Sequence, residues 1–181
     1  AVANDMRSLT RAVRRVGQGE IDTPIEVQRR DEIGELAHNF HRMRHSLFTD
    51  PLTGASNRSA LQHILTTLTR PLPGQSMAAP FALLFVDLDR FKPLNDRWGH
   101  ATGDRVIQAV AGAMVDITRE QDVVGRLGGE EFLLILTETD GQGALASAER
   151  LRESIQDMDS VTSDDNQTVR FTISVGVTTY S

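Results

Sequence analysis

Apolar side chains recur at alternating steps of three and four residues in two stretches near the start of the chain. They are Val2, Met6, Leu9, Val13 and Val16, and then Ile33, Leu36, Phe40, Met43 and Leu47. This 3.5-residue period is typical of helices that pack through a narrow coiled-coil seam. Two short helices cannot bury both seams alone, so we expect partner helices, which a parallel homodimer would supply. The alternative is an antiparallel hairpin, although a connector of about a dozen residues is long for one.

The connector carries residues that break helices. Gly17 and Gly19 end the first helix, and the segment 23–27, which contains Pro24, is expected to be extended. Pro51 then interrupts the second helix, because proline disfavours helix in the residue that precedes it. We therefore predict a helical module over residues 1–48 and a second domain over residues 49–181.

Beyond Pro51, stretches of helical period alternate with stretches of strand period. We expect helices near 58–68, 103–118 and 141–157, a loop over 70–80, and strands at 81–88, 122–127, 131–137 and 169–178. A short irregular or helical stretch leads through Trp98. The order strand, helix, hairpin, helix, strand predicts an α+β domain with helices packed on a largely antiparallel sheet.

Composition and charge narrow the class of protein. The hydrophobic content of 39% and the charged content of 24% are ordinary for a soluble domain. No apolar run approaches the ~18 residues that a membrane-spanning helix needs. The net charge of −6, without a long basic stretch, argues against a nucleic-acid polymer as partner but leaves a nucleotide open. The chain has no cysteine, which excludes disulfides and thiolate metal sites.

The pentapeptide Gly128-Gly129-Glu130-Glu131-Phe132 lies between two apolar runs and reads as the turn of a hairpin. Glycines let a phosphate approach the backbone closely, and adjacent carboxylates are oxygen ligands for Mg²⁺. A turn that carries both suits a metal-bound nucleotide. A solvated tight turn is the alternative, and the pattern alone does not decide between them.

Further polar residues follow the strand expected at 81–88. Asp87 and Asp89 share one face of its end, where they could hold a metal with Glu130 for two-metal phosphoryl transfer, or simply be solvated. Lys92 could neutralise phosphate charge. Asn95 and Asp104 offer acceptors to the guanine edge, although a turn cap and a first-turn acid are the ordinary interpretations.

A family resemblance covers the first module. Gly17-x-Gly19 followed by Asp31-Glu32-Ile33-Gly34-Glu35-Leu36 resembles a HAMP module, the parallel four-helix relay of bacterial membrane receptors. The resemblance implies that a transmembrane helix and a sensor domain lie upstream. The chain would then be the cytoplasmic portion of a bacterial inner-membrane protein, linked to the membrane only through those upstream segments.

Four segments, in the correct order, resemble the motifs of GGDEF-type diguanylate cyclases. They are Asp50-x-Leu52-Thr53-Gly54-x-x-Asn57-Arg58, Asp87-Leu88-Asp89-Arg90-Phe91-Lys92-x-x-Asn95-Asp96, Gly99-His100-x-x-Gly103-Asp104 and Arg126-x-Gly128-Gly129-Glu130-Glu131-Phe132. The resemblance implies a palm-like nucleotidyl-cyclase domain, with a central, mostly antiparallel sheet flanked by helices. Members join two GTP molecules into cyclic di-GMP by in-line attack of a ribose 3′-oxygen on the other α-phosphorus. Two domains must therefore face each other.

The resemblance also implies site residues. Asp87, the main-chain carbonyl of Leu88 and Glu130 would bind Mg²⁺ or Mn²⁺, with Glu131 assisting. Glu130 would accept the proton of the attacking hydroxyl, and Lys92 would stabilise phosphate charge. Substrate contacts would come from Phe91, Lys92, Asn95, His100, Asp104, Gly128 and Gly129, with Asn95 and Asp104 reading guanine.

Arg119-Glu120-Gln121-Asp122 resembles the family's product-binding inhibitory site, and Arg150 matches the place of a second arginine from a neighbouring domain. A surface ion pair is the alternative. The family continues past the strand at Ser174-Val175-Gly176-Val177 with a helix and a strand that carry phosphate-binding cations. This chain stops at Ser181, so we expect a domain without those elements, an exposed sheet face and uncertain activity of the fragment.

Three hypotheses follow. The first is a dimeric, HAMP-controlled diguanylate cyclase in bacterial signal transduction. The second is a catalytically silent receptor for GTP or cyclic di-GMP on the same fold, and the third is a dimerisation relay alone. Intact Asp87, Glu130 and Lys92 favour the first.

Overall fold

The computed structural model describes residues 2–17, 31–70, 79–158 and 161–181, in two compact units, Ala1–Thr49 and Asp50–Ser181. The extended connector expected at 23–27 and most of the loop expected at 70–80 lie outside the described residues. No helix in the part of the chain that the structure describes is long and apolar enough to cross a membrane.

The first unit contains two helices, α1 (Val2–Gly17) and α2 (Glu32–Phe48). Asp31 caps α2 by accepting a hydrogen bond from the Gly34 amide at 3.3 Å, as the Asp-Glu-x-Gly pattern favours. The two helices bury a small shared core of Leu9, Ala37 and Phe40, and Ala12 is also buried. Other seam positions stay open, and Met6, Val13, Leu36, Met43 and Leu47 are each more than 40% exposed. One copy of the pair therefore covers only part of its apolar seam.

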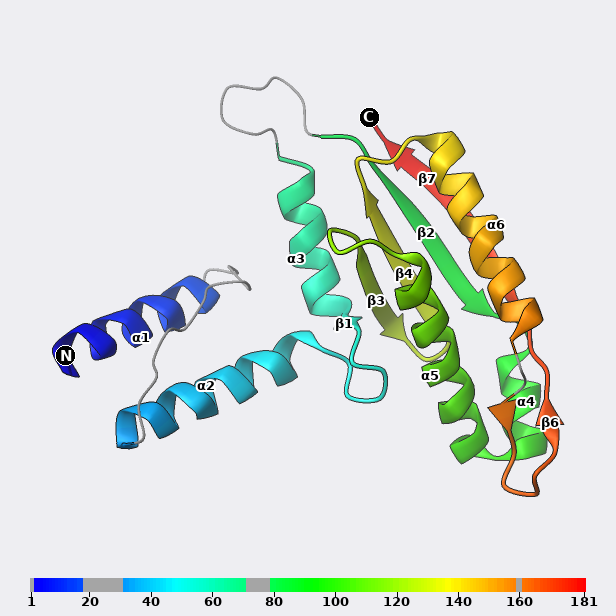
Figure 1. Cartoon of the computed structure of the whole chain (residues 1–181), viewed down its shortest axis with the longest axis horizontal. Helices are drawn as coiled ribbons and strands as arrows, with labels where there is room; N and C mark the ends of the chain where they lie inside the picture. Colours follow the sequence, from blue (N-terminus) through cyan, green and yellow to red (C-terminus); the bar gives the residue numbers. More distant parts are fainter. Residues whose placement is uncertain (1, 18–30, 71–78, 159–160) are drawn as a thin grey trace. The chain divides into compact units, whose positions relative to one another are not determined.

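A five-stranded sheet organises the second unit (Figure 1). The strands lie in the order β1 (Ser56–Asn57), β3 (Val123–Gly128), β4 (Glu131–Thr137), β2 (Phe81–Leu88) and β7 (Ile173–Tyr180). Only β1 and β3 run parallel, and the other neighbours are antiparallel. The predicted α+β class with a mostly antiparallel sheet is confirmed.

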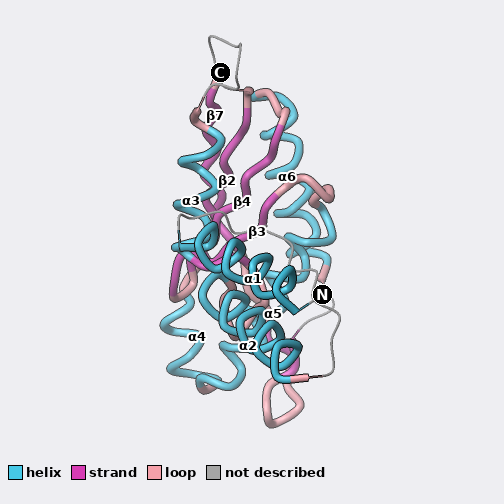
Figure 2. The backbone as a smooth tube through the Cα atoms, turned by 90° about the vertical axis from the view of Figure 1, so that its left-hand side faces the viewer, coloured by secondary structure: helices cyan, strands magenta, loops and turns pink. Residues whose placement is uncertain are grey.

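Alternation along the strands separates two apolar layers. On β2, Leu84, Val86 and Leu88 face the main core with α5 (His100–Ile117) and α6 (Gly141–Asp157). Phe81 belongs to a second core with Leu61 of α3 (Arg58–Leu68). Figures 1 and 2 show the sheet between α3 and the α5–α6 pair. The main core covers one face of the sheet, and on the other face α3 packs over β1 and β3. Phe85 of β2 and Tyr180 of β7 are 48% and 41% exposed, so part of the sheet stays open, as the sequence led us to expect.

The prediction of one continuous strand over residues 169–178 is wrong. Val169 belongs to β6 (Thr168–Val169), which pairs with β5 (Val161–Thr162) in a separate two-stranded sheet, and β7 begins only at Ile173. Val169 and Ile173 are both buried, so the apolar alternation continues across the break between the strands.

The stretch that leads through Trp98 is a helix, α4 (Phe91–Trp98). The next helix, α5, begins at His100, three residues before the expected start.

Gly125 marks a close approach of α3 to the sheet. A Cβ at this buried position would lie 2.5 Å from the Leu61 side chain. We predict that Gly125→Ala destabilises the second unit by about 1–3 kcal/mol through overpacking. The measurement is urea unfolding, with Gly112→Ala on α5 as control, because a Cβ there meets nothing within 4 Å. Removing a helical glycine should stabilise by about 0.5–1 kcal/mol, and equal effects of the two substitutions would contradict the prediction.

Candidate active site

The two glycines shape the turn between β3 and β4. Gly128 pairs with Glu131, and Gly129 and Glu130 form the two-residue turn between them. The φ angles of Gly128 and Gly129 are +144° and +54°, a region that favours glycine, and a Cβ on either residue would meet no neighbour within 4 Å. The hairpin prediction is confirmed. The turn presents its main chain to solvent directly beside the carboxylates of Glu130 and Glu131.

The fold brings this turn to the end of β2. In the antiparallel pairing of β2 with β4, Asp87 lies opposite Glu131, and the Leu88 amide donates to the Glu130 carbonyl at 3.4 Å. Burial and then the charges of Glu130, Glu131 and Asp89 raise the pKa of Asp87 above its usual value. Three neighbouring carboxylates therefore repel the charge of Asp87. Within the described ranges, however, no three acidic or histidine side chains are arranged as a metal cage.

Asp89 plays a different part from Asp87, although both belong to one motif. Its carboxylate accepts hydrogen bonds of 2.6 Å from the hydroxyls of Thr172 and Ser174, and its amide donates to the Thr172 carbonyl at 3.0 Å. The hydroxyls of Ser174 and Thr172 lower the pKa of Asp89. Asp89 thus ties the end of β2 to the start of β7, which leaves Asp87 as the open carboxylate of the motif.

Arg126 is a positioning residue that sequence reasoning left without a role. Its Nε and Nη2 donate to the Gly129 carbonyl at 3.1 and 2.8 Å, and its Nη1 lies 3.1 Å from each carboxylate oxygen of Asp50. Asp50 also accepts from the amide and hydroxyl of Thr53 at 3.0 and 2.8 Å. Burial opposes ionisation of Asp50, but the hydrogen bonds from Thr53 and Arg126 outweigh it and lower the pKa. One guanidinium therefore joins the first residues of the domain to the glycine turn.

The expected nucleoside contacts lie on α4 and α5. Lys92, His100 and Asp104 are exposed, whereas the Phe91 side chain is buried in the main core. Asn95 holds its Oδ1 buried and without a hydrogen-bond partner among the described residues. Gly103 allows this arrangement, because a Cβ there would lie 1.9 Å from that oxygen. An unpaired buried acceptor is costly, so this oxygen is suited to a donor from a ligand.

The structure also brings together the three residues expected at an inhibitory site. Arg119, Asp122 and Arg150 line a cleft of about 540 Å³ between the ends of α5, β4 and α6. Asp122 accepts from the Arg119 amide at 2.9 Å and from the Thr137 amide at 3.1 Å, and Arg150 donates to the Ile117 carbonyl at 2.9 Å. Asp122 is thus fixed by main-chain donors, and the Arg119 side chain stays exposed.

Charge repulsion at Asp87 yields a prediction for metal-free protein. Because its folded-state pKa is raised above the ordinary 3.8, the folded protein keeps the proton where the unfolded chain has lost it. Stability therefore falls as pH rises through this window, and ionised Asp87 destabilises the fold at neutral pH. In the presence of a metal chelator, Asp87→Asn should raise the melting temperature at pH 7. The free energy of unfolding should rise by about 0.5 kcal/mol or less. Lower stability than the parent at pH 7, with Glu153→Gln unchanged, would refute this.

The Arg126 contacts yield a second prediction. Lysine cannot span both Asp50 and the Gly129 carbonyl, so Arg126→Lys should cost about 1.5–3 kcal/mol in urea unfolding. Arg58→Lys is the matched control, because Arg58 donates an exposed hydrogen bond to the Leu127 carbonyl and does not join two segments as Arg126 does. A double-mutant cycle with Asp50→Asn should show coupling of about 0.5–3 kcal/mol. Additive effects would show that the pair does not act as one unit.

Comparison with known proteins adds family membership to this geometry. A model of the diguanylate cyclase GGDEF domain matches residues 47–181, and a model of the HAMP domain matches residues 1–49. The diguanylate cyclase DgcM of Escherichia coli K12 is 38% identical over 150 residues, which cover 81% of this chain and 34% of that protein. The chain thus spans about a third of the length of this curated relative.

Two solved structures share the fold. The coiled-coil and GGDEF domain of DgcB from Caulobacter crescentus, in complex with c-di-GMP, matches with a TM-score of 0.76 at 26% identity, covering 83% of this chain and 78% of that one. The diguanylate cyclase SiaD of Pseudomonas aeruginosa, in complex with its activator SiaC, matches with a TM-score of 0.67 at 31% identity, covering 99% and 70%. The family model covers most of the chain, and the chain therefore belongs to the GGDEF family of diguanylate cyclases.

Proposed function

We propose that this chain is the catalytic part of a diguanylate cyclase, which condenses two GTP molecules into cyclic di-GMP and two pyrophosphates. One observation carries the proposal. The register of β2 with β4 sets Asp87 beside the glycine turn and its two glutamates, in a chain of the GGDEF family. Phosphoryl transfer needs such an arrangement, because catalysis depends on positioning and on charge stabilisation around the transferred group.

The donor set at the strand end fits a divalent cation. Asp87, the Leu88 carbonyl, Glu130 and Glu131 are hard oxygen donors, and burial followed by the charges of Glu130, Glu131 and Asp89 raises the pKa of Asp87. We assign these four groups to Mg²⁺ or Mn²⁺. When bound, the metal would supply Lewis-acid stabilisation of the phosphate oxygens.

The main chain and the adjacent cations would hold the phosphates. Arg90 adopts the left-handed conformation (φ 55°, ψ 37°) directly before α4, so it turns consecutive amides near Phe91 into a concave anion site. The buried ring of Phe91 fixes this backbone, and only its amide is available to a ligand. Lys92, one residue further, would neutralise phosphate charge, and Gly128 and Gly129 would allow close approach on the opposite side.

The chemical step follows from these positions. The 3′-hydroxyl oxygen of one nucleotide attacks the α-phosphorus of the other, and Glu130 accepts the hydroxyl proton. The bond from the α-phosphorus to its bridging oxygen breaks, and the electron pair leaves with pyrophosphate. A second, equivalent step closes the cyclic product.

Guanine recognition is proposed for Asn95 of α4 and Asp104 of α5. The Asn95 Oδ1, which has no partner among the described residues, and the exposed carboxylate of Asp104 are acceptors, and the guanine N1–H and 2-amino group are donors. Adenine lacks this donor pair, so the two residues would discriminate against ATP. His100, at the first position of α5, would contact the nucleoside.

Each domain would hold one GTP, so catalysis requires a homodimer. The exposed apolar positions of α1 and α2 support this, because a second copy of the pair would cover Met6, Leu36 and Met43. We propose that the HAMP module controls the encounter of the two sites. The HAMP match also supports a place in the cytoplasmic portion of a membrane-linked signalling protein.

Product feedback is proposed for the cleft of Arg119, Asp122 and Arg150. Arginine pairs bidentately with phosphate and with guanine edges, and the three side chains share one cleft. The DgcB structure was solved with c-di-GMP bound, which supports product binding in the family.

The decisive experiment is incubation with GTP and Mg²⁺, followed by chromatography and mass spectrometry of the product. We expect cyclic di-GMP from GTP, and a loss of about 10²–10⁴-fold in Glu130→Gln through removal of the general base. Glu153→Gln, on the exposed face of α6, is the control and should keep the parental rate. Binding of GTP without turnover would replace the proposal with the silent-receptor alternative.

The feedback proposal has its own measurement. Arg119→Ala should raise the cyclic di-GMP concentration for half-maximal inhibition at least about tenfold, since it removes a charge-assisted contact worth about 1.5–3 kcal/mol. Arg152→Ala is the control, because Arg152 pairs with Glu149 outside the cleft. Inhibition that is equally strong in Arg119→Ala and in the parent would assign the effect to another site.

A further inference from the structure

A large cleft opens beside Asp87 on the side of α4 that the proposed mechanism leaves unused. It has a volume of about 870 Å³ and lies between α4 and the segment 170–172 that leads into β7. Its lining includes Arg90, Arg97 and Arg170, together with Trp98 and Phe171. We name it the arginine cleft. Its volume falls in the range of about 300–1,000 Å³ that is typical of ligand sites.

The three arginines of the cleft are not neutralised by ion pairs. Among the described residues, the ion pairs of the domain join Arg105 to Asp164, Arg126 to Asp50 and Arg152 to Glu149. Two carboxylates also line the cleft, Asp87 and Asp89. The hydroxyls of Thr172 and Ser174 hold Asp89 in short hydrogen bonds, and Asp87 belongs to the proposed metal site. The charge of Arg90 is partly shared with Asp89, whose pKa it helps to lower, and none of the described ion pairs involves Arg97 or Arg170. Their guanidinium groups are therefore available to an external anion.

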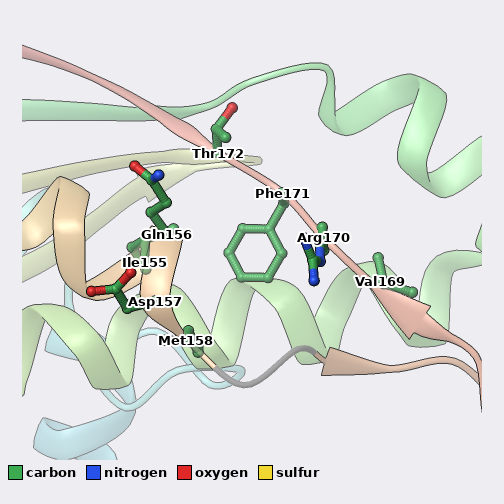
Figure 3. Close-up of a pocket in the computed structure, with 8 residues that line it drawn as sticks. All are labelled: Ile155, Gln156, Asp157, Met158, Val169, Arg170, Phe171 and Thr172. Atoms are coloured by element: carbon green, nitrogen blue, oxygen red, sulfur yellow. The ribbon is translucent and has the colours of Figure 1, made fainter.

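The walls of the arginine cleft are fixed by contacts on its far side. Figure 3 shows Phe171 pointing from the segment 170–172 toward the end of α6, into a smaller cavity of about 330 Å³. The ring packs against the main core, and Thr172 is joined to Asp89 through side chain and main chain. Arg170 thus projects from an anchored segment rather than from a free loop.

The opposite wall holds a second arginine in place. The guanidinium carbon of Arg97 lies 4.5 Å from the centre of the Trp98 ring. Such a stack restricts the guanidinium to one plane while its edge N–H groups stay free to donate. A restricted arginine loses less conformational entropy when it binds an anion, so this arrangement favours recognition of a multiply charged oxyanion.

We propose that the arginine cleft binds the pyrophosphate that leaves during the reaction, an inference that rests on the proposed function. Asp87 belongs both to the proposed metal site and to the lining of this cleft, so the two share a boundary. Breaking the bond between the α-phosphorus and its bridging oxygen releases a compact, multiply charged anion there. Arg90, Arg97 and Arg170, which line the cleft, would supply cationic contacts to that anion.

The experiment uses the fluorescence of Trp98, the single tryptophan of the chain and part of the cleft wall. Sodium pyrophosphate is titrated into the protein in a buffer that contains a metal chelator and no nucleotide, at constant ionic strength. We expect a saturable change in the parent, and at least tenfold weaker binding in Arg170→Ala. Arg152→Ala, which removes an exposed arginine outside the cleft, should match the parent. Arg97→Ala is a second, independent variant. Its pyrophosphate binding is measured by calorimetry, because removing Arg97 from the Trp98 ring also changes the fluorescence of the free protein.

Two results would overturn the inference. One is an identical pyrophosphate curve in Arg170→Ala and the parent. The other is an equal response to inorganic sulfate or phosphate, which would show general attraction of anions. The cyclase assay separates the two proposals. Cyclic di-GMP formation together with an unchanged pyrophosphate curve in Arg170→Ala would refute only the proposed role of the arginine cleft. Arginine-dependent pyrophosphate binding without cyclic di-GMP formation would remove only the proposed cyclase activity.

Discussion

The charged contact of Arg126 with Asp50 and the Gly129 carbonyl is the constraint on which the candidate site depends. The turn of two glycines has little intrinsic preference for one shape, because glycine loses more conformational freedom on folding than any other residue. Arg126 restricts this freedom by holding the turn carbonyl from one side, while β-sheet pairing holds Glu131 opposite Asp87 from the other. Asp50, itself fixed by Thr53, orients the guanidinium. The arrangement of Asp87, Glu130 and Glu131 thus depends on Arg126, which forms no described hydrogen bond with any of these three side chains.

The same division between fixed support and open chemistry recurs across the domain. Asp89 is saturated by hydroxyls and joins two strands, whereas Asp87, two residues earlier, stays exposed beside the glutamates. Phe91 is buried and holds the backbone of the turn before α4, whereas Lys92 extends into solvent. In each pair one residue is immobilised by packing or hydrogen bonding, and the other stays exposed. Asp87 and Asp89 share one face of the strand, so the hydroxyls of Thr172 and Ser174, rather than alternation, distinguish them.

Much of this organisation was predictable from the sequence, because its signals are local. The apolar run of β2 and the Gly-Gly turn fix a strand and a hairpin, and the order of motifs indicated that Asp87 and Glu130 would meet. The division of the last strand was not predictable, since Val169 and Ile173 are both buried at even spacing although they belong to two different sheets. The contact of Arg126 with Asp50 was equally hidden, because its partners are 76 residues apart. The arginine cleft required three-dimensional information too, as Arg97 and Arg170 meet only through the fold.

The exposed position of the carboxylates has a consequence for the evolution of such domains. Asp87 and Glu131 contribute no packing to either core, so replacing them leaves the fold intact and relieves repulsion. Selection for stability therefore cannot preserve these carboxylates, which persist only where their chemistry is used. One or two substitutions at these positions would abolish that chemistry while the fold and its clefts stay in place.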